Sequence, residues 1–206
     1  CIVDDSATLV WLANLAALEL HTHQHRIAAP EQATAVVFDF DPGEPATVIE
    51  CARVALDLRS LLDRLGLESV VKTSGSKGLH VSVPLNTGTV DDDLAKAFSL
   101  ALGRMLAAAA PDRVTIAMAK EQRVGRVFVD WSQNDAHKTT VAAYSMRARP
   151  RPTVSTPLTW DEVSDALDGG DPEPLAFEID AVLARIEQVG DLYALNGDQH
   201  RADQTY

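Results

Sequence analysis

Val36-Val37-Phe38-Asp39-Phe40-Asp41-Pro42-Gly43 is an apolar run that ends in two carboxylates. Such a run is typical of a buried central strand. Because residues i and i+2 of a strand face the same side, Asp39 and Asp41 point at one place. Aspartates before Pro-Gly also occur as ordinary turn residues. Two like charges held this close are best explained by a divalent cation, and we predict a metal site at Asp39 and Asp41.

A glycine-rich turn, Ser74-Gly75-Ser76-Lys77-Gly78, follows one helix later. The two glycines allow the backbone to approach a ligand closely, and Ser74 and Lys77 can donate to phosphate oxygens. His80, on the strand after the turn, is positioned to face the same pocket. Taken alone, the turn is better explained as a plain hairpin, but its position one helix after the carboxylate pair favours a phosphate-binding role. A metal pair beside a phosphate-binding turn predicts phosphoryl or nucleotidyl transfer.

A third carboxylate, Asp130, is delivered in the same way as the first two. It ends the short apolar stretch 127–129, although a plain strand-end aspartate would look the same. Carboxylates from strand ends can bind two divalent ions about 3.5–4 Å apart. One ion would activate an attacking hydroxyl, and the other would hold a triphosphate and stabilise the leaving pyrophosphate.

Arg147 and three histidines are further candidates for ligand contacts. Arg147 has a planar guanidinium that suits bidentate phosphate binding, with a basic, Pro-rich exit segment as the alternative. His21, His23 and His25 alternate, so an extended backbone would bring them to one side, as in a metal site. Solvated loop histidines are the simpler explanation of this pattern.

The order of expected elements is that of an α+β domain. A helix is expected over 6–20 behind an Asp5 N-cap, and the chain beyond 195 is expected to be disordered. Thr47 and Glu50 form a capping box. The other expected elements are strands at 35–39, 70–71, 79–83, 127–129 and 139–146 and helices over 48–65, 94–110, from 160 and over 179–189. Two of the helices should back the sheet, and the strands at 70–71 and 79–83 should form a hairpin.

The net charge of −12 is unevenly distributed along the 206 residues. Residues 1–151 hold 16 Lys and Arg against 18 Asp and Glu, whereas residues 152–206 hold 2 against 12. The basic stretch 113–151 could meet phosphates, or it could be a solvated face. Neither a membrane-spanning run nor a signal peptide is visible, and Cys1 and Cys51 are expected to be reduced thiols. The chain opens without a Met, and we expect it to be a fragment of a longer chain.

The ordered motifs resemble a known family. Asp-x-Asp, then Ser-Gly-x-Lys-Gly-x-His, then a strand-end Asp is similar to the three motifs of the archaeo-eukaryotic primase superfamily. The stretches 127–134, 138–140 and 144–150 more closely resemble the polymerase domain of bacterial ligase D, of the actinobacterial type. The resemblance covers residues from about 7 to about 193. The three motifs are specific only in combination.

This resemblance implies a catalytic core similar to an RNA-recognition fold, with a mixed sheet backed by helices. It implies template-dependent nucleotidyl transfer with two divalent ions, Mn²⁺ or Mg²⁺, at DNA gaps or ends in non-homologous end joining. The implied partners are primer-template DNA, NTP or dNTP with a preference for ribonucleotides, a DNA ligase and an end-binding protein. No membrane partner is implied, and the expected location is the bacterial cytoplasm, at the nucleoid.

The resemblance also gives individual positions a role. The catalytic, metal-binding carboxylates of the family match Asp39, Asp41 and Asp130. Its contacts to the nucleotide phosphates match Ser74, Lys77, His80 and Arg147, and its histidine near the nucleotide sugar matches His21. Residues 1–193 then form the catalytic part of the domain, without its N-terminal, template-binding portion, and 194–206 form a polar tail or linker.

Two other functions stay open at the level of sequence. A haloacid-dehalogenase-type phosphatase also has an apolar strand followed by Asp-x-Asp, with the first Asp as nucleophile. Such enzymes usually carry Thr or Val soon after the second Asp, where this chain has Pro42-Gly43. A non-catalytic nucleic-acid-binding module built on the basic stretch 113–151 is the second alternative.

Overall fold

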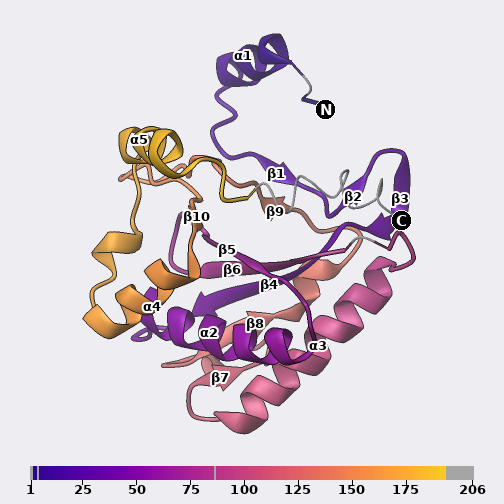
Figure 1. The fold of residues 1–206 in the computed structure, drawn as a ribbon, viewed down its shortest axis with the longest axis vertical. Helices are drawn as coiled ribbons and strands as arrows, with labels where there is room; N and C mark the ends of the chain where they lie inside the picture. Colours follow the sequence, from indigo (N-terminus) through magenta and orange to yellow (C-terminus); the bar gives the residue numbers. More distant parts are fainter. Residues whose placement is uncertain (1, 4, 86, 194–206) are drawn as a thin grey trace.

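Strand β4 (Ala35–Pro42) lies inside a six-stranded mixed sheet, as the apolar run predicts (Figure 1). The structure is a computed structural model that describes residues 2, 3, 5–85 and 87–193. The strand order is β10-β5-β6-β4-β8-β7, in which only β7 and β8 run parallel. The other strands of this sheet are β5 (Val70–Thr73), β6 (Leu79–Pro84), β7 (Val114–Thr115), β8 (Val127–Asp130) and β10 (Pro157–Leu158). The predicted α+β class and the β5–β6 hairpin are confirmed.

Helices α2 (Val48–Arg64) and α3 (Asp92–Ala109) pack on one face of the sheet (Figure 1). Both begin and end close to their predicted positions because their caps are local: the Thr47–Glu50 capping box forms, and Asp91 accepts from Leu94 N. Alternation along β4 sends Phe38 and Phe40 into the core beneath these helices. The odd-numbered residues of β4 therefore face the opposite side, which the two helices leave open.

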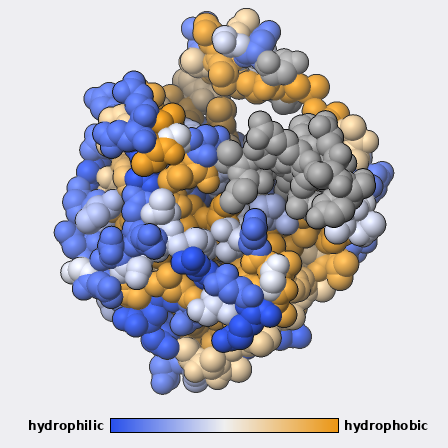
Figure 2. All heavy atoms as spheres, in the orientation of Figure 1, coloured by the Kyte–Doolittle hydropathy of each residue, from blue (hydrophilic) through white to orange (hydrophobic). Residues whose placement is uncertain are grey.

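The predicted helix over 6–20 is wrong in its extent. Helix α1 (Ser6–Asn14) has the expected Asp5 cap, but it stops six residues before Leu20, and Ala16 adopts φ 56°. None of the residues of α1 is buried, and its apolar side chains face solvent (Figure 2). Since no packing partner extends the helix, its apolar spacing did not mark a buried stripe.

The predicted strand over 139–146 is also wrong in its extent. Only β9 (Thr140–Val141) forms, and it pairs with β1 (His21–Thr22). Tyr144 has φ 65°, which ends any extended run. A second small pair joins β2 (His25–Arg26) to β3 (Ala29–Ala33). His21 and His25 thus belong to two separate strand pairs, and His23 lies between them.

The C-terminal part returns to the sheet through β10, which pairs with β5. Helix α4 (Trp160–Gly169) then packs beside α2, where Arg59 lies over the Trp160 ring at 5.1 Å, and α5 (Ile179–Val189) follows. Short 3-10 helices occur as η1 (Lys120–Gln122), η2 (Trp131–Asn134) and η3 (Glu173–Leu175). The helices predicted from 160 and over 179–189 are confirmed as α4 and α5. Strand β10 was missed because two residues carry no periodicity.

Three smaller expectations concern the thiols, the membrane and the tail. Cys51 is a buried free thiol, as predicted. Within the described ranges, no helix has the length and apolar character needed to cross a membrane. The predicted disorder beyond 195 and the proposed tail at 194–206 lie outside the described residues.

Candidate active site

The register of the sheet gathers the three predicted carboxylates. Asp39 lies directly opposite Asp130 of β8, and Asp41 lies two residues further along β4. Residues that face each other across two strands share a side of the sheet, as do residues i and i+2 of one strand. All three side chains therefore leave the sheet on the face that α2 and α3 do not cover.

The charges of these carboxylates influence one another. Burial, and then the neighbouring Asp39 and Asp130, raise the pKa of Asp41 to about 6. Burial also acts against ionisation of Asp39, but His80, Lys72 and Lys138 outweigh it and hold the pKa of Asp39 below its usual range. A cation between these groups would relieve the repulsion at Asp41.

The donor set suits a divalent ion, because Mg²⁺ and Mn²⁺ prefer carboxylate oxygens. In the part of the chain that the structure describes, no three Asp, Glu, His or Cys side chains converge as a ready set of ligands. Asp39 and Asp130 each give one oxygen to a basic side chain instead, His80 at 3.2 Å and Lys138 at 3.3 Å. The chemistry and the charge of the three carboxylates fit a metal, while these two bases occupy part of the site.

Asp130 is fixed by the turn that follows it. Its Oδ1 atom accepts a hydrogen bond from Ser132 N at 3.0 Å and another from the Ser132 hydroxyl. The buried Asn134 then bonds both backbone groups of Val37, accepting from N and donating to O at 2.7 Å each. This side chain continues the ladder on β4 where β8 has ended.

The glycine-rich turn fits tightly against β4. An added Cβ at Gly78 would lie 1.9 Å from the Phe40 carbonyl oxygen, and Gly75 has φ +66°. The Ser74 hydroxyl oxygen accepts from Ser76 N at 3.2 Å and from Gly78 N at 3.1 Å. Because no acceptor for its O–H lies among the described residues, Ser74 can still donate to a ligand.

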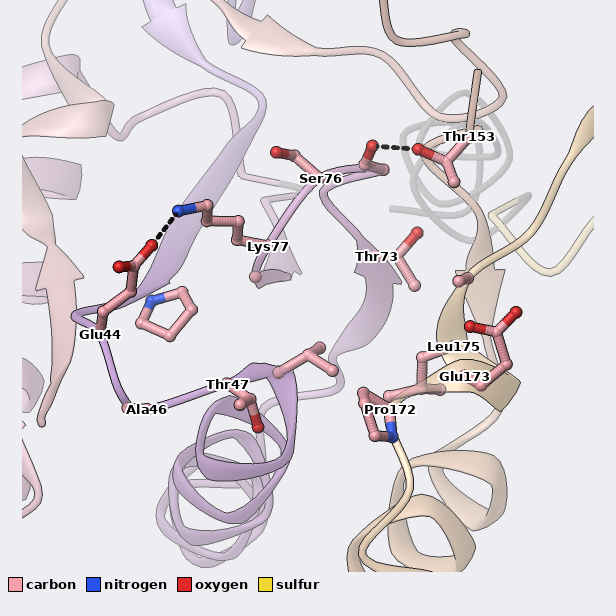
Figure 3. A pocket seen from close by; sticks show the side chains of 15 residues that line it. Glu44, Ala46, Thr47, Thr73, Ser76, Lys77, Thr153, Pro172, Glu173 and Leu175 are labelled. Carbon is pink, nitrogen blue, oxygen red and sulfur yellow. Dashed lines mark hydrogen bonds and ion pairs between the residues drawn. The ribbon is translucent and has the colours of Figure 1, made fainter. Parts of the chain in front are cut away.

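The Lys77 side chain is paired with a glutamate. Its ammonium donates to Glu44 Oε1 at 2.9 Å, at the edge of a second cavity of about 320 Å³ behind the turn (Figure 3). That cavity is lined by the start of α2 and by residues of η3, including Thr47 and Leu175. Both side chains of the ion pair are largely exposed, so the pair is weak.

Glu19, which the sequence did not single out, joins two predicted nucleotide contacts. Its carboxylate lies 3.2 Å from Arg147 Nε and 3.3 Å from His21 Nε2, and it accepts from Ala148 N at 2.9 Å. Arg147 also donates through Nη1 to the Ser74 carbonyl oxygen at 2.7 Å. The guanidinium is therefore anchored beside the glycine-rich turn.

One cavity of about 280 Å³ collects most of the predicted site. Seven of the eight predicted residues line it: His21, Asp39, Asp41, Ser74, Lys77, His80 and Arg147. Asp130 lies beside it, opposite Asp39. His23 and His25 instead stack on each other, with ring centroids 4.7 Å apart. The ligand roles of all these residues stay predictions.

Several other lining or supporting residues were missed. Gln133, Thr139, Thr140 and Arg149 line the same cavity, and Lys72 lies buried behind His80. Gln133 and Arg149 fall inside the stretches 127–134 and 144–150, which resemble the ligase D polymerase domain, but no local pattern gave them a role. Lys72 follows two valines in a buried strand, and a charged residue at that place was the available signal.

The chain was compared with known proteins. The family described as LigD, primase-polymerase domain, matches residues 1–193. The multifunctional non-homologous end joining protein LigD of Mycolicibacterium smegmatis is 42% identical over 205 residues, which are 98% of this chain and 26% of the relative. The bifunctional non-homologous end joining protein LigD of Bacillus subtilis is 31% identical over 92% of this chain and 30% of its own length. The chain thus spans about a quarter of the length of these relatives.

A solved structure agrees with the sequence relatives. The polymerase domain of Mycobacterium tuberculosis ligase D in complex with DNA superposes with a TM-score of 0.85 at 42% identity. The match covers 96% of this chain and 69% of that one. On the family match, the identities and the shared fold, this chain belongs to the LigD primase-polymerase domain family.

Proposed function

We propose that this chain is the catalytic part of a polymerase that adds nucleotides to DNA ends or gaps in non-homologous end joining. The observation that carries the proposal is the single cavity that brings Asp39 and Asp41 together with Ser74, His80 and Arg147. Transfer of a nucleotide from a triphosphate requires carboxylates that bind metal ions and, facing them, side chains that donate hydrogen bonds to the phosphate oxygens. The DNA-bound polymerase domain of the M. tuberculosis protein supports DNA as the partner.

The three carboxylates are proposed to hold two divalent ions, Mn²⁺ or Mg²⁺. When bound, such ions lower the pKa of the attacking hydroxyl and stabilise the leaving pyrophosphate. Asp39 offers the oxygen that His80 leaves unbonded, and Asp41 is turned toward the cavity. Burial, and then Asp39 and Asp130, raise the pKa of Asp41, and this supports the assignment because cation binding would relieve the repulsion between the carboxylates.

The nucleotide phosphates are proposed to lie against the glycine-rich turn. The Ser74 hydroxyl can donate to a phosphate oxygen, as can the Nη2 group of Arg147, which has no hydrogen-bond partner among the described residues. Lys77 lines the same cavity and would reach phosphate after leaving Glu44. His21, which also lines the cavity from β1, is proposed to lie near the nucleotide sugar.

The wider setting is part of the same proposal. Whole LigD proteins carry end joining in their names, and the chain spans only about a quarter of them. From membership of this family, we therefore propose a DNA ligase and an end-binding protein as partners. We also propose a preference for ribonucleotides and a location at the bacterial nucleoid.

The test is nucleotide addition to a short gapped DNA with a 5′-phosphate, in Mn²⁺, with each ribonucleotide and deoxyribonucleotide in turn. The matched control is the double variant Asp39→Ala/Asp41→Ala. Templated addition by the parent chain that is lost in the control supports the proposal. Addition that survives in the double variant contradicts the site. Metal-independent DNA binding without addition would favour a binding module, and hydrolysis of a generic phosphomonoester that is lost on Asp39→Asn would favour a phosphatase.

A further inference from the structure

A row of ionisable side chains crosses four strands of the sheet on the face of the site. Lys72 of β5 lies opposite His80 of β6, His80 lies opposite Asp39 of β4, and Asp39 lies opposite Asp130 of β8. Residues at directly opposed positions share a face and touch their neighbours. The row therefore continues the candidate metal site by one residue beyond His80, into the interior.

The contacts along this row are direct. Lys72 Nζ lies 3.1 Å from His80 Nδ1, and His80 Nε2 lies 3.2 Å from Asp39 Oδ1. Lys72 Nζ also donates to the Ser155 hydroxyl oxygen at 2.7 Å, and Ser155 donates onward to the Thr73 carbonyl at 2.8 Å. Lys72 is 1% exposed and His80 is 5% exposed, so neither side chain can exchange these partners for water.

The chemistry of the partners fixes the protons on the ring. A carboxylate only accepts, so His80 Nε2 must carry the proton that it shares with Asp39. Nδ1 faces the amino group of Lys72 at 3.1 Å, and a lysine ammonium has only N–H donors, so Nδ1 offers its lone pair there. Lys72 must therefore donate to Nδ1, which both the ammonium and the neutral amine can do.

Burying the amino group of a lysine at this position costs stability, so its presence indicates a function. Burial lowers the pKa of Lys72 to about 7, and an apolar side chain of similar length would avoid the loss of hydration. Its neighbours Val70 and Val71 are apolar, and the solvent-facing end of the cavity lies on the other side of His80. The N–H donor is what this lysine supplies and a methionine would not.

We propose that Lys72 is a positioning residue that holds His80 as the Nε2–H tautomer, so that His80 fixes the Asp39 carboxylate for metal and nucleotide. The inference rests on the proposed function for the role of Asp39 as a metal ligand. The tautomer of His80 does not depend on that role. Partners behind a ligand residue of this kind typically contribute 10–100-fold to metal affinity or rate.

The first test reads the tautomer directly. Long-range ¹H–¹⁵N correlation spectra of histidine-labelled protein, with His80→Gln to assign the signal, should show a proton on Nε2 and none on Nδ1 of His80. A proton on Nδ1 in the parent chain would overturn the proposal without any variant. Lys72→Met should lose the single tautomer, whereas Lys96→Met, which removes an ammonium paired with Asp135 at 2.7 Å, should keep it.

The second test measures function in the same variants. Lys72→Met should weaken Mn²⁺ binding, measured by titration calorimetry, and lower the nucleotide-saturated rate by about 10–100-fold, with the nucleotide KM changed by less than about threefold. Lys72→Gln keeps an N–H donor and should recover part of both losses. A folded Lys72→Met protein with one tautomer, unchanged Mn²⁺ binding and a rate within about twofold would refute the role.

A failure of the proposed function can be distinguished from a failure of the role proposed for Lys72. If the parent chain adds no nucleotide, the proposed function fails, while the tautomer and the Mn²⁺ affinity still report on Lys72. If Lys72→Met does not fold, Lys72→Gln and the parent spectrum take its place. A glutamine variant that folds, keeps one tautomer and retains part of the Mn²⁺ affinity supports an N–H donor at this position, whereas a folded glutamine variant with two tautomers but unchanged Mn²⁺ binding and rate would overturn the proposal.

Discussion

Asp41→Asn should stabilise the protein in the absence of divalent ions while removing the proposed nucleotide addition. Asp41 is ionised at neutral pH although burial, and then the neighbouring carboxylates Asp39 and Asp130, raise its pKa to about 6 from an ordinary value of 3.8. An amide at the same position has no charge to repel. Natural chains keep destabilising charges of this kind where function needs them.

The magnitude and the pH window follow from the same two values. A carboxyl whose pKa is higher in the folded than in the unfolded state binds its proton more tightly when folded. The loss of folding stability that ionised Asp41 causes is therefore complete above pH 6 and disappears as the pH falls from 6 toward 3.8. The difference corresponds to about 3 kcal/mol. The surrounding groups partly desolvate the Asp41 carboxylate, but the side chain still reaches solvent at the cavity, so solvent screening reduces the expected effect to about 1 kcal/mol.

The assay is urea unfolding in EDTA at about pH 7.5 and about pH 5. Asp41→Asn should be more stable than the parent by about 1 kcal/mol at the higher pH, and the gap should shrink at the lower one. Asp57→Asn, on the exposed face of α2, is the matched control and should show no such pH-dependent gap. Added Mn²⁺ should stabilise the parent more than Asp41→Asn. An Asp41→Asn protein less stable than the parent at about pH 7.5 would refute the reasoning.

Three further predictions follow from single contacts. Asn134→Ala removes two buried hydrogen bonds to the β4 backbone and should cost about 2–4 kcal/mol in urea unfolding; a loss below about 0.5 kcal/mol would contradict it. Glu44→Gln frees Lys77 from an exposed ion pair and should lower the nucleotide KM by no more than about fivefold, whereas a rise would show that Glu44 itself assists binding. Gly78→Ala drives a methyl into the β4 backbone and should lower the unfolding free energy by about 3 kcal/mol or more, while Gly169→Ala, with open space around it, should not.

Elements with local signals could be predicted from the sequence. The start of α2 follows from the Thr47–Glu50 box, and the start of α3 follows from Asp91. The end of α1 could not be predicted, because an apolar Ala/Leu run suggests a buried helix whether or not a partner exists. The short extent of β9, inside the strand predicted over 139–146, also could not be predicted, since its pairing with β1 depends on residues about 120 positions away.

The candidate site shows the same division. Motifs marked Asp39, Asp41 and His80, because the chemistry of each is visible in a few consecutive residues. Lys72 and its partner Ser155 are 83 positions apart, and only the pairing of β5 with β6 and β10 brings them together. The motifs therefore mark the acidic and phosphate-binding side chains of the cavity, whereas Gln133 and Thr140 carry no local signal and the buried Lys72 is marked only by its charge.

The register of β4 links the fold to the proposed chemistry. If β4 slipped by one residue, Asp39 and Asp41 would turn into the core beneath α2 and α3, and Phe38 and Phe40 would turn out. The core thus holds the carboxylates on the open face, since burying two charges in place of two fully buried phenyl rings would cost far more than a weak repulsion at Asp41. Each backbone contact that fixes this register, such as the Asn134 side chain on β4, therefore acts on stability and on the site together. A variant that weakens the register should lose metal affinity in proportion to stability, whereas Asp41→Asn should separate the two.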